Sequence, residues 1–380
     1  MQIILFVMDG LKIGGVESAL ISVFHHIDFQ KYNIDLLLLH SMDDLRNEVP
    51  KEVNILYLDK VDANRKSIRF TLIWLVYKFF TMICFSEYAK KYSLKMQNLA
   101  AEEKGKCILK EAYDKVIAYK HGEAENFVAF SVKAKQKILF YHHGSIIDDE
   151  LHKRAFPHFQ TIVAVSDGVK ELLERKYPEH KDKLQVIPNY IDPEYVKNRA
   201  NEYIVERPKT DIVLCTVGRL SPEKNYQLAL DVAIELKNRN TDYIWYFIGE
   251  GEEREAIEHI VDEFGLSDRV VLTGALKNPL PYVAICDVYI QTSDVESYGL
   301  SIQEALILGK PVVSTRTIGG RLLLREQCSS VLAESDKNSV LDGIEKCLHN
   351  TTSTTAASWK SKDENTSILW EEILKDGLRN

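Results

Sequence analysis

Short apolar runs alternate with amphipathic segments of helical length along almost the whole chain. Parallel strands need long crossovers, usually helices, so this alternation predicts α/β architecture with parallel sheets covered on both faces. The expected strands lie at residues 3–7, 34–39, 54–58, 116–118, 137–141, 161–165, 184–187, 212–217, 243–248, 270–273, 288–291 and 311–314.

A break at residues 188–193, followed by a polar stretch to residue 210, separates these strands into two groups. A chain of 380 residues is long enough for two domains. We therefore expect two doubly wound, Rossmann-like domains, at residues 1–190 and 205–350, with ligands in a cleft between the carboxyl ends of their strands. Residues 350–365 read as a polar connection to a closing helix around residues 368–374.

Two glutamates, Glu296 and Glu304, bracket the junction between the strand at 288–291 and a helix that Gly309 closes. Glu296 is expected in the loop, and Glu304 about one and a half turns inside the helix. Free amides and the helix dipole favour an anion at the helix N-terminus, which is formed by Tyr298, Gly299 and Leu300. Taken alone, a glutamate pair at this spacing is more typical of a solvated surface.

A second motif follows the strand at 213–217. Ser221 and Pro222 predict a helix N-cap and a first-turn proline. Arg219 and Lys224 bracket this turn, where two fixed cations are well placed to neutralise a diphosphate. An ordinary exposed loop would also explain the two cations by themselves.

A third motif, Gly14-Gly15, opens a helix after the first strand, where glycine allows close backbone approach and positive φ near a phosphate. It is neither a Gly-x-Gly-x-x-Gly nor a P-loop sequence, so neither a dinucleotide nor a P-loop nucleotide site is favoured. A simple turn is the alternative.

The expected anion-binding helix N-terminus at residues 298–300, flanked by the carboxylates of Glu296 and Glu304, suits a nucleotide-sugar. Such a molecule has phosphates in the middle and many hydroxyl groups at both ends.

In this order and at this separation, the three motifs resemble the family 4 retaining glycosyltransferases of the bacterial cell-surface polysaccharide type, which have the GT-B fold. The resemblance covers nearly the whole chain and is most specific from Val213 to Val313. Other matching segments are Val163-Ala-Val-Ser166, Val186-Ile-Pro-Asn189, Phe247-Ile-Gly-Glu-Gly251, Val271-Leu-Thr-Gly274 and Gly309-Lys-Pro-Val-Val313.

The resemblance implies roles for these residues. Glu304 would hold the ribose hydroxyls, Glu296 hydroxyls of the transferred sugar, and Arg219 with Lys224 the diphosphate. The other donor-binding residues implied are Gly14, Gly15, Glu250, Tyr298, Gly299, Leu300 and His143. His142 is the preferred candidate for a histidine that reaches the sugar, with His143 close behind and His121 weaker.

Further implications concern cofactors and domains. No Asp-x-Asp occurs with supporting context, so neither a metal nor another cofactor is expected. The first domain would bind the acceptor and the second the donor, with a C-terminal helix at 365–380 packing back on the first. Two departures from the family pattern are the Glu missing after Gly319-Gly320 and Tyr298 in place of Phe.

Charge is distributed unevenly along the chain. Residues 60–137 contain 16 Lys and Arg against 8 Asp and Glu, although the whole chain has a net charge of −8. The acidic remainder disfavours nucleic acid, whereas the basic region suits an anionic membrane surface or a lipid diphosphate. Residues 70–85 are apolar and aromatic but too short to span a bilayer; an interfacial helix and a buried helix are both open readings.

Six cysteines without paired spacing indicate a reducing compartment. The N-terminus leads directly into a strand instead of a signal peptide. We therefore expect a cytoplasmic protein, peripheral at the inner face of the membrane. Its donor would be a UDP-sugar and its acceptor a saccharide or lipid-diphosphate-linked saccharide of capsule or lipopolysaccharide. The alternatives are a GT-B-fold nucleotide-sugar epimerase and a non-catalytic partner of another glycosyltransferase.

Overall fold

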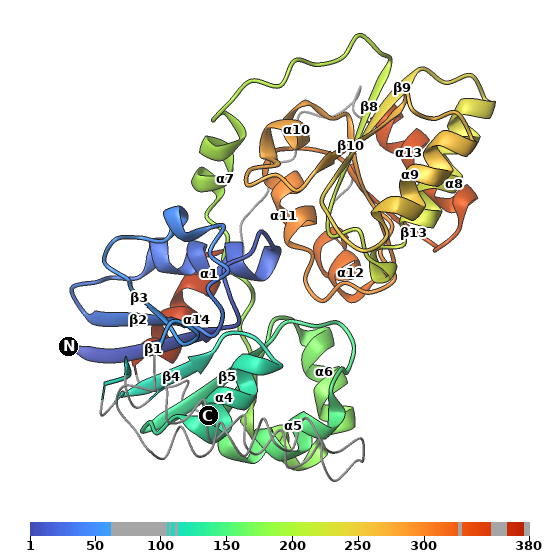
Figure 1. The fold of residues 1–380 in the computed structure, drawn as a ribbon. Coiled ribbons are helices and arrows are strands. Elements are labelled where there is room, and N and C mark those ends of the chain that lie inside the picture. The colour runs from blue at the N-terminus through green and yellow to red at the C-terminus, as the bar shows by residue number, and fades with distance from the viewer. Residues whose placement is uncertain (62–104, 106–107, 111–112, 326–328, 351–362, 376–380) are drawn as a thin grey trace, which may run out of the picture. The chain divides into compact units, whose positions relative to one another are not determined.

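The computed structural model describes residues 1–380 except 62–104, 106–107, 111–112, 326–328, 351–362 and 376–380 (Figure 1). Its contacts divide the chain into two compact units. The first contains Met1–Lys12, Val23–His142 and Ile146–Ile187, and the second contains Ile13–Ser22, His143–Ser145 and Pro188–Asn380. Each unit is built on one parallel sheet.

The first unit has a seven-stranded sheet in the order β3-β2-β1-β4-β5-β6-β7. The chain winds outward from β1 in one direction and then from β4 in the other, which defines a doubly wound sheet with its switch point between β1 and β4. Its strands are β1 (Gln2–Met8), β2 (Tyr32–Leu38), β3 (Asn54–Tyr57), β4 (Lys115–Ala118), β5 (Gln136–Tyr141), β6 (Thr161–Ala164) and β7 (Leu184–Val186). The helices that the structure describes in this half of the chain are α1 (Gly15–His26), α4 (Glu123–Ser131), α5 (Asp149–Ala155) and α6 (Asp167–Lys176), with 3₁₀ turns at Arg46–Glu48, Phe156–His158 and Pro178–Lys183.

The second unit repeats this topology with six strands in the order β10-β9-β8-β11-β12-β13. Its switch point therefore lies between β8 and β11. The strands are β8 (Ile212–Val217), β9 (Tyr243–Ile248), β10 (Val270–Gly274), β11 (Val288–Gln291), β12 (Val312–Thr315) and β13 (Val331–Ala333). The helices are α7 (Pro193–Ala200), α8 (Tyr226–Asn238), α9 (Arg254–Glu263), α10 (Leu280–Ile285), α11 (Leu300–Ile307), α12 (Ile318–Leu324), α13 (Lys337–Asn350) and α14 (Asp363–Lys375), with a 3₁₀ turn at Pro222–Lys224.

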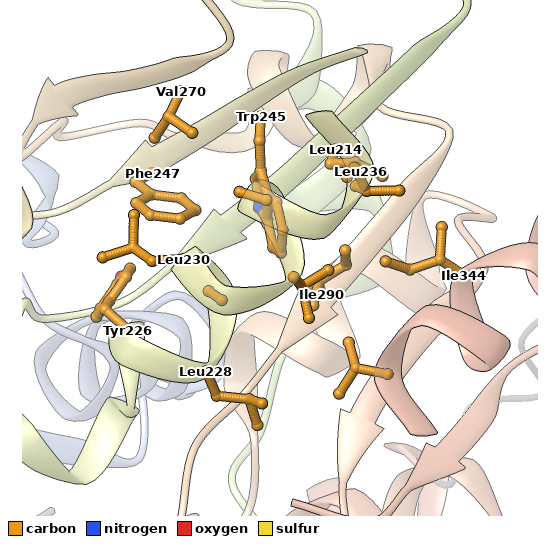
Figure 2. Close-up of a cluster of buried hydrophobic side chains, with 14 of the residues drawn as sticks. Leu214, Tyr226, Leu228, Leu230, Leu236, Trp245, Phe247, Val270, Ile290 and Ile344 are labelled. Carbon is orange, nitrogen blue, oxygen red and sulfur yellow. The ribbon is translucent and has the colours of Figure 1, made fainter. Parts of the chain in front are cut away.

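Successive side chains of a strand point to opposite faces, and the second sheet uses this alternation to build two cores. Leu214 and Ile290 pack with α8, α9 and α13 on one face, while Cys215 and Tyr289 pack with α10, α11 and α12 on the other. Figure 2 shows the first of these cores, including Trp245 of β9. Burial on both faces rigidly fixes the strand ends that carry the polar loops described below.

The fold class predicted from the sequence is confirmed: both halves are doubly wound parallel α/β domains. All twelve expected strands are present, with ends that differ from the expected ones by at most two residues. The short strand β13 was not predicted. The stretch after residue 188 is also more ordered than expected, because Asp192 caps α7 by accepting a hydrogen bond from the Glu194 amide (2.9 Å).

Three expectations remain predictions. The functional division into an acceptor domain and a donor domain is not tested by the fold, nor is the packing of the C-terminal helix on the first domain. The apolar segment at 70–85 lies outside the described residues. Among the helices that the structure describes, none has the length and apolar character required to cross a bilayer.

Candidate active site

The candidate site of the second unit lies at the switch point of its sheet. β8 and β11 are neighbours, paired through Val288 with Leu214 and Tyr289 with Cys215. The loop after β8 carries Arg219 and Lys224, and the loop after β11 carries Glu296. Parallel strands present their carboxyl ends at one edge, so the two loops meet where doubly wound sheets bind ligands.

The loop after β8 corrects one expectation from the sequence. Ser221 does not cap the long helix: residues Pro222–Lys224 form a 3₁₀ turn, and Ser221 makes no capping hydrogen bond there. The cap of α8 is Asn225, which adopts a left-handed conformation (φ 48°) and accepts a hydrogen bond from the Leu228 amide (3.1 Å). Asn tolerates this conformation better than most residues, so the chain turns at Asn225 before α8 begins.

Two glycines after β9 allow this loop to pack backbone against backbone. A Cβ on Gly249 would lie 1.9 Å from the Gly218 oxygen, and one on Gly251 would lie 2.1 Å from the Leu220 oxygen. Between them, Glu250 accepts a hydrogen bond from the Leu220 amide through its carbonyl (2.9 Å). The exposed Glu250 side chain is paired with Arg254 of α9. The glycine motif therefore supports the backbone that carries Arg219.

An ion pair joins the two loops. Lys224 Nζ lies 2.6 Å from Glu296 Oε2, and the two side chains are only 20% and 14% exposed. The sequence assigned these residues to different parts of a ligand and did not predict their contact. Arg219, in contrast, is exposed, and it makes no ion pair within the described ranges of the chain.

Backbone and side-chain hydrogen bonds hold the same two loops in register. The Thr292 hydroxyl donates to the Lys224 carbonyl (3.1 Å), and the Asn225 amide group donates to Asp294 Oδ1 (3.1 Å). The Asp294 backbone amide donates to the Glu223 carbonyl (2.9 Å). These hydrogen bonds hold the two loops against each other, so Lys224 and Glu296 lie on one connected surface.

The start of α11 has the geometry that the sequence predicted. Gly299 is the N-cap in a left-handed conformation (φ 87°), Leu300 is the first helical residue, and Gly309 follows the helix with φ 71°. Tyr298 is buried. A Cβ on Gly319 of α12 would lie 2.6 Å from the Tyr298 carbonyl, and the Gly319 amide donates to the Glu296 carbonyl (2.9 Å). The Gly319-Gly320 pair therefore forms a helix start that packs against the glutamate loop.

Glu304 is the carboxylate on the first turns of α11. Burial raises its pKa to about 7, and the positive charge of Arg199 opposes that shift. The side chain is nevertheless partly exposed and makes no hydrogen bond within the part of the chain that the structure describes. A partly exposed carboxylate that receives no hydrogen bond from these residues is well suited to accept hydrogen bonds from ligand hydroxyls.

The glycine pair groups with the second unit, as does His143. Neither Gly14 nor Gly15 has the positive φ suggested from the sequence. The small size of Gly15 matters instead, because a Cβ on it would lie 3.1 Å from Leu300 Cδ1. His143 is partly buried, and its Nδ1 lies within hydrogen-bond distance of the Ser145 carbonyl (3.1 Å), amide (3.2 Å) and hydroxyl (3.0 Å).

His142 groups with the first unit and is 7% exposed. Its ring packs 4.8 Å from that of Tyr119 and 6.1 Å from that of Phe140. Burial, helped by the charge of Lys120, lowers the pKa of His142 to about 3, so its ring is neutral at physiological pH. The structure thus gives the two adjacent histidines different surroundings, and the choice between them remains a prediction.

The structure adds Gln291, Asn225 and Asp294, which the sequence reasoning did not select. The signals were present: an amide at the end of an apolar strand, and an asparagine directly after the lysine. No group of three or more His, Cys, Asp or Glu that could hold a metal ion occurs within the described ranges.

Two family models match the chain: "Glycosyl transferases group 1" over residues 198–365 and "Glycosyltransferase Family 4" over residues 105–195. The Campylobacter jejuni N-acetylgalactosamine-N,N'-diacetylbacillosaminyl-diphospho-undecaprenol 4-alpha-N-acetylgalactosaminyltransferase is 27% identical over 62% of this chain and 64% of its own length. The 2-deoxystreptamine glucosyltransferase of Streptomyces kanamyceticus is 33% identical over 34% of this chain and 36% of its own. The matches therefore span less than two thirds of these relatives.

Solved structures agree in fold. Anabaena Alr3699/HepE in complex with UDP-glucose has a TM-score of 0.70 at 18% identity, covering 98% of this chain and 99% of that one. S. aureus TarM, in a complex that contains UDP, has a TM-score of 0.68 at 14% identity, covering 100% and 97%. The two doubly wound sheets are thus those of the GT-B class. The two family models together cover more than half of the chain, and they show that it belongs to the family 4-like glycosyltransferases.

Proposed function

We propose that this protein is a retaining, hexosyltransferase-type enzyme that moves a sugar from a UDP-sugar to a saccharide or lipid-diphosphate-linked saccharide. The observation that carries the proposal is the gathering of Lys224, Glu296 and the α11 N-terminus at the switch point of the second sheet. One cation, one carboxylate and one set of free amides supply the polar contacts that a sugar diphosphate needs.

In the proposed mechanism, Lys224 and Arg219 bind the diphosphate and stabilise the charge that develops as it leaves. Fixed charges of this kind act without reorganisation during the reaction, and each can contribute about 3 kcal/mol to the transition state. Glu296 accepts from hydroxyls of the transferred sugar, and Glu304 accepts from the ribose. Helix amides and the two cations take the place of a metal ion.

The choice of donor and acceptor rests on similar proteins. UDP occurs in the solved complexes of HepE and TarM. Among the relatives, the Campylobacter enzyme is named for a diphospho-undecaprenol acceptor, and Rhizobium meliloti LpsE is named for lipopolysaccharide core biosynthesis. A role in cell-surface polysaccharide assembly, on a lipid-linked acceptor at the inner face of the membrane, is the proposal they support.

The test begins with thermal shift of the full chain against UDP- and GDP-sugars. The stabilising donors are then assayed for slow hydrolysis with and without a chelator, and the anomer released is identified by NMR. We expect UDP-sugars to stabilise the protein, hydrolysis to survive chelation, and the released anomer to retain the donor configuration. Conversion of the donor into a free nucleotide-sugar isomer would instead identify an epimerase, and binding without any reaction would identify a non-catalytic partner protein.

A further inference from the structure

A buried amide lies directly behind the proposed sugar-binding glutamate. Gln291 ends β11, an otherwise apolar strand apart from the Tyr289 hydroxyl, and is 2% exposed. Its Nε2 donates to Ser293 Oγ (2.7 Å) and to Glu296 Oε2 (3.3 Å). Its Oε1 lies 3.2 Å from the hydroxyl of Tyr289. Both ends of the amide therefore have hydrogen-bond partners. These partners offset the free-energy cost of burying a polar amide in the strand.

Gln291 and Lys224 converge on the same atom. Lys224 Nζ lies 2.6 Å from Glu296 Oε2, the oxygen that also receives the Gln291 hydrogen bond. The structure gives Oε1 no hydrogen bond or ion pair within its described residues. The carboxylate is thus held by one oxygen and presents the other.

We propose that Gln291 is a positioning residue, which fixes the carboxylate of Glu296 so that Oε1 faces the donor sugar. This inference rests on the proposed function, because it assigns Glu296 to the sugar. An amide suits the position because it donates at one end and accepts at the other. The Glu296 carboxylate, which is paired with Lys224, accepts hydrogen bonds and therefore favours the orientation that places Nε2 toward it. The Tyr289 hydroxyl lies 3.2 Å from both Oε1 and the Val217 carbonyl and can donate to either oxygen.

The proposal makes Gln291 important while a diphosphate occupies Lys224. In the ligand-free protein both donors hold Oε2. When the lysine turns to the phosphates, the Gln291 hydrogen bond alone keeps the carboxylate oriented. The loss of Gln291 should therefore affect turnover more than the binding of donor or of UDP.

The kinetic test compares Gln291→Leu with Ser314→Ala as a matched control. Ser314 is a fully buried hydroxyl on the neighbouring strand β12, and its hydrogen bond goes to the Thr315 carbonyl. We expect Gln291→Leu to lower kcat for donor hydrolysis about 10-fold, with KM and the UDP Kd changed less than about 2-fold. Ser314→Ala should leave kcat unchanged. A Gln291→Leu enzyme with the kcat of the control overturns the proposal.

A double mutant separates positioning from general destabilisation. If Gln291 acts only through Glu296, adding Gln291→Leu to Glu296→Gln should not lower kcat further. A multiplicative loss in the double mutant would assign Gln291 a structural role and overturn the proposal. If Gln291→Leu does not fold, Tyr289→Phe tests the same arrangement. It should lower kcat about 3-fold in the parent and not in the Glu296→Gln background, and an equal loss in both overturns the proposal.

Crystal structures of the parent and of Gln291→Leu, each with UDP or inorganic pyrophosphate bound so that Lys224 is engaged, distinguish this proposal from the proposed function. If the parent protein neither hydrolyses nor transfers any sugar, the proposed function fails, and the orientation of Glu296 alone decides the positioning. If the Glu296 carboxylate rotates or moves from its parent position in the variant, the positioning role of Gln291 is supported. An unmoved carboxylate overturns that role even if the enzyme is active.

Discussion

At the scale of single residues, the ion pair between Lys224 and Glu296 determines how the site meets its ligand. Each residue neutralises the other in the ligand-free protein, so a diphosphate must compete with Glu296 for the lysine. Lys224→Ala removes both the proposed phosphate contact and the partner of a largely buried carboxylate. Arg219→Ala removes an exposed cation and leaves no buried carboxylate without its ion-pair partner.

The first prediction concerns these two cations. Lys224→Ala and Arg219→Ala should each lower the transfer rate by about 100-fold, because the proposed mechanism places both beside charge that grows in the transition state. Only Lys224→Ala should also lower the thermal unfolding midpoint. Steady-state kinetics and thermal unfolding measure the two effects. Near-normal rates in both variants would remove the diphosphate assignment.

The second prediction separates the two glutamates. Glu304→Gln should weaken UDP binding, since its proposed partner is the ribose. Glu296→Gln should lose turnover but bind UDP normally or more tightly, because Lys224 no longer shares its charge with a carboxylate. Calorimetry of UDP binding beside a hydrolysis assay tests both. The reverse pattern would show that the two roles are exchanged.

The third prediction uses the raised pKa of Glu304. A carboxyl whose folded pKa is about 7, against about 4.3 when unfolded, makes its full contribution to the stability of the fold below the unfolded value. That stability is lost as pH rises toward 7. Glutamine cannot ionise, so Glu304→Gln should raise the unfolding midpoint by about 2–4 °C at pH 8 and not at pH 4. A lower midpoint at pH 8 would identify Glu304 as a structural carboxylate instead of a ligand-binding one.

At the scale of elements, the start of α8 depends on Asn225, which combines a left-handed backbone with a helix cap and a bridge to Asp294. Asn225→Ala should lower the free energy of unfolding by about 2 kcal/mol, from the lost cap and the left-handed strain. Asn225→Gly keeps the backbone conformation and should cost less than about 1 kcal/mol. Urea unfolding measures both. Gln227→Ala, which removes an exposed pair with Asp231 (2.9 Å), is the control. Equal losses for Ala and Gly would contradict the left-handed requirement.

The elements of the fold could be predicted because buried parallel strands are continuous apolar runs, and because glycine and proline mark the turns between them. Gly309 illustrates this, since its φ of 71° ends α11 where the sequence placed the stop. The cap of α8 was misplaced because Ser221-Pro222 has the same local signature as a helix start, whereas the deciding feature was the left-handed Asn225. The three-residue strand β13 is too short to show a period.

The candidate site could be predicted residue by residue but not as an arrangement. Lys224 and Glu296 are 72 residues apart in the chain, and only the strand order places β8 beside β11. The same applies to Gln291, whose importance comes from the single oxygen that it contacts. Local patterns identify which residues can do chemistry, whereas topology decides which of them meet.

At the scale of the whole molecule, the uneven charge is the feature that the proposed acceptor must explain. Residues 60–137 carry a surplus of cations in a chain of net charge −8. Each cation near an anionic leaflet contributes about 1 kcal/mol, and salt screens the attraction. A basic segment of this kind would bring the enzyme to a lipid-linked acceptor without a membrane-spanning helix.

The last prediction tests this attraction. The protein should bind anionic vesicles at low salt, release them toward about 0.5 M salt, and ignore neutral vesicles. Replacing Arg65, Lys66 and Arg69 with Glu should weaken this binding, measured by co-sedimentation, and leave hydrolysis of a soluble donor unchanged. The matched control replaces three exposed lysines of the second unit by Glu, at Lys209, Lys277 and Lys346. Both variants change the net charge by the same amount. An equal loss of vesicle binding would therefore show that net charge, and not the basic segment, causes the binding. A parent protein that ignores anionic vesicles at low salt would favour an acceptor in solution, because nothing would then hold the site at the leaflet where a lipid-linked sugar resides.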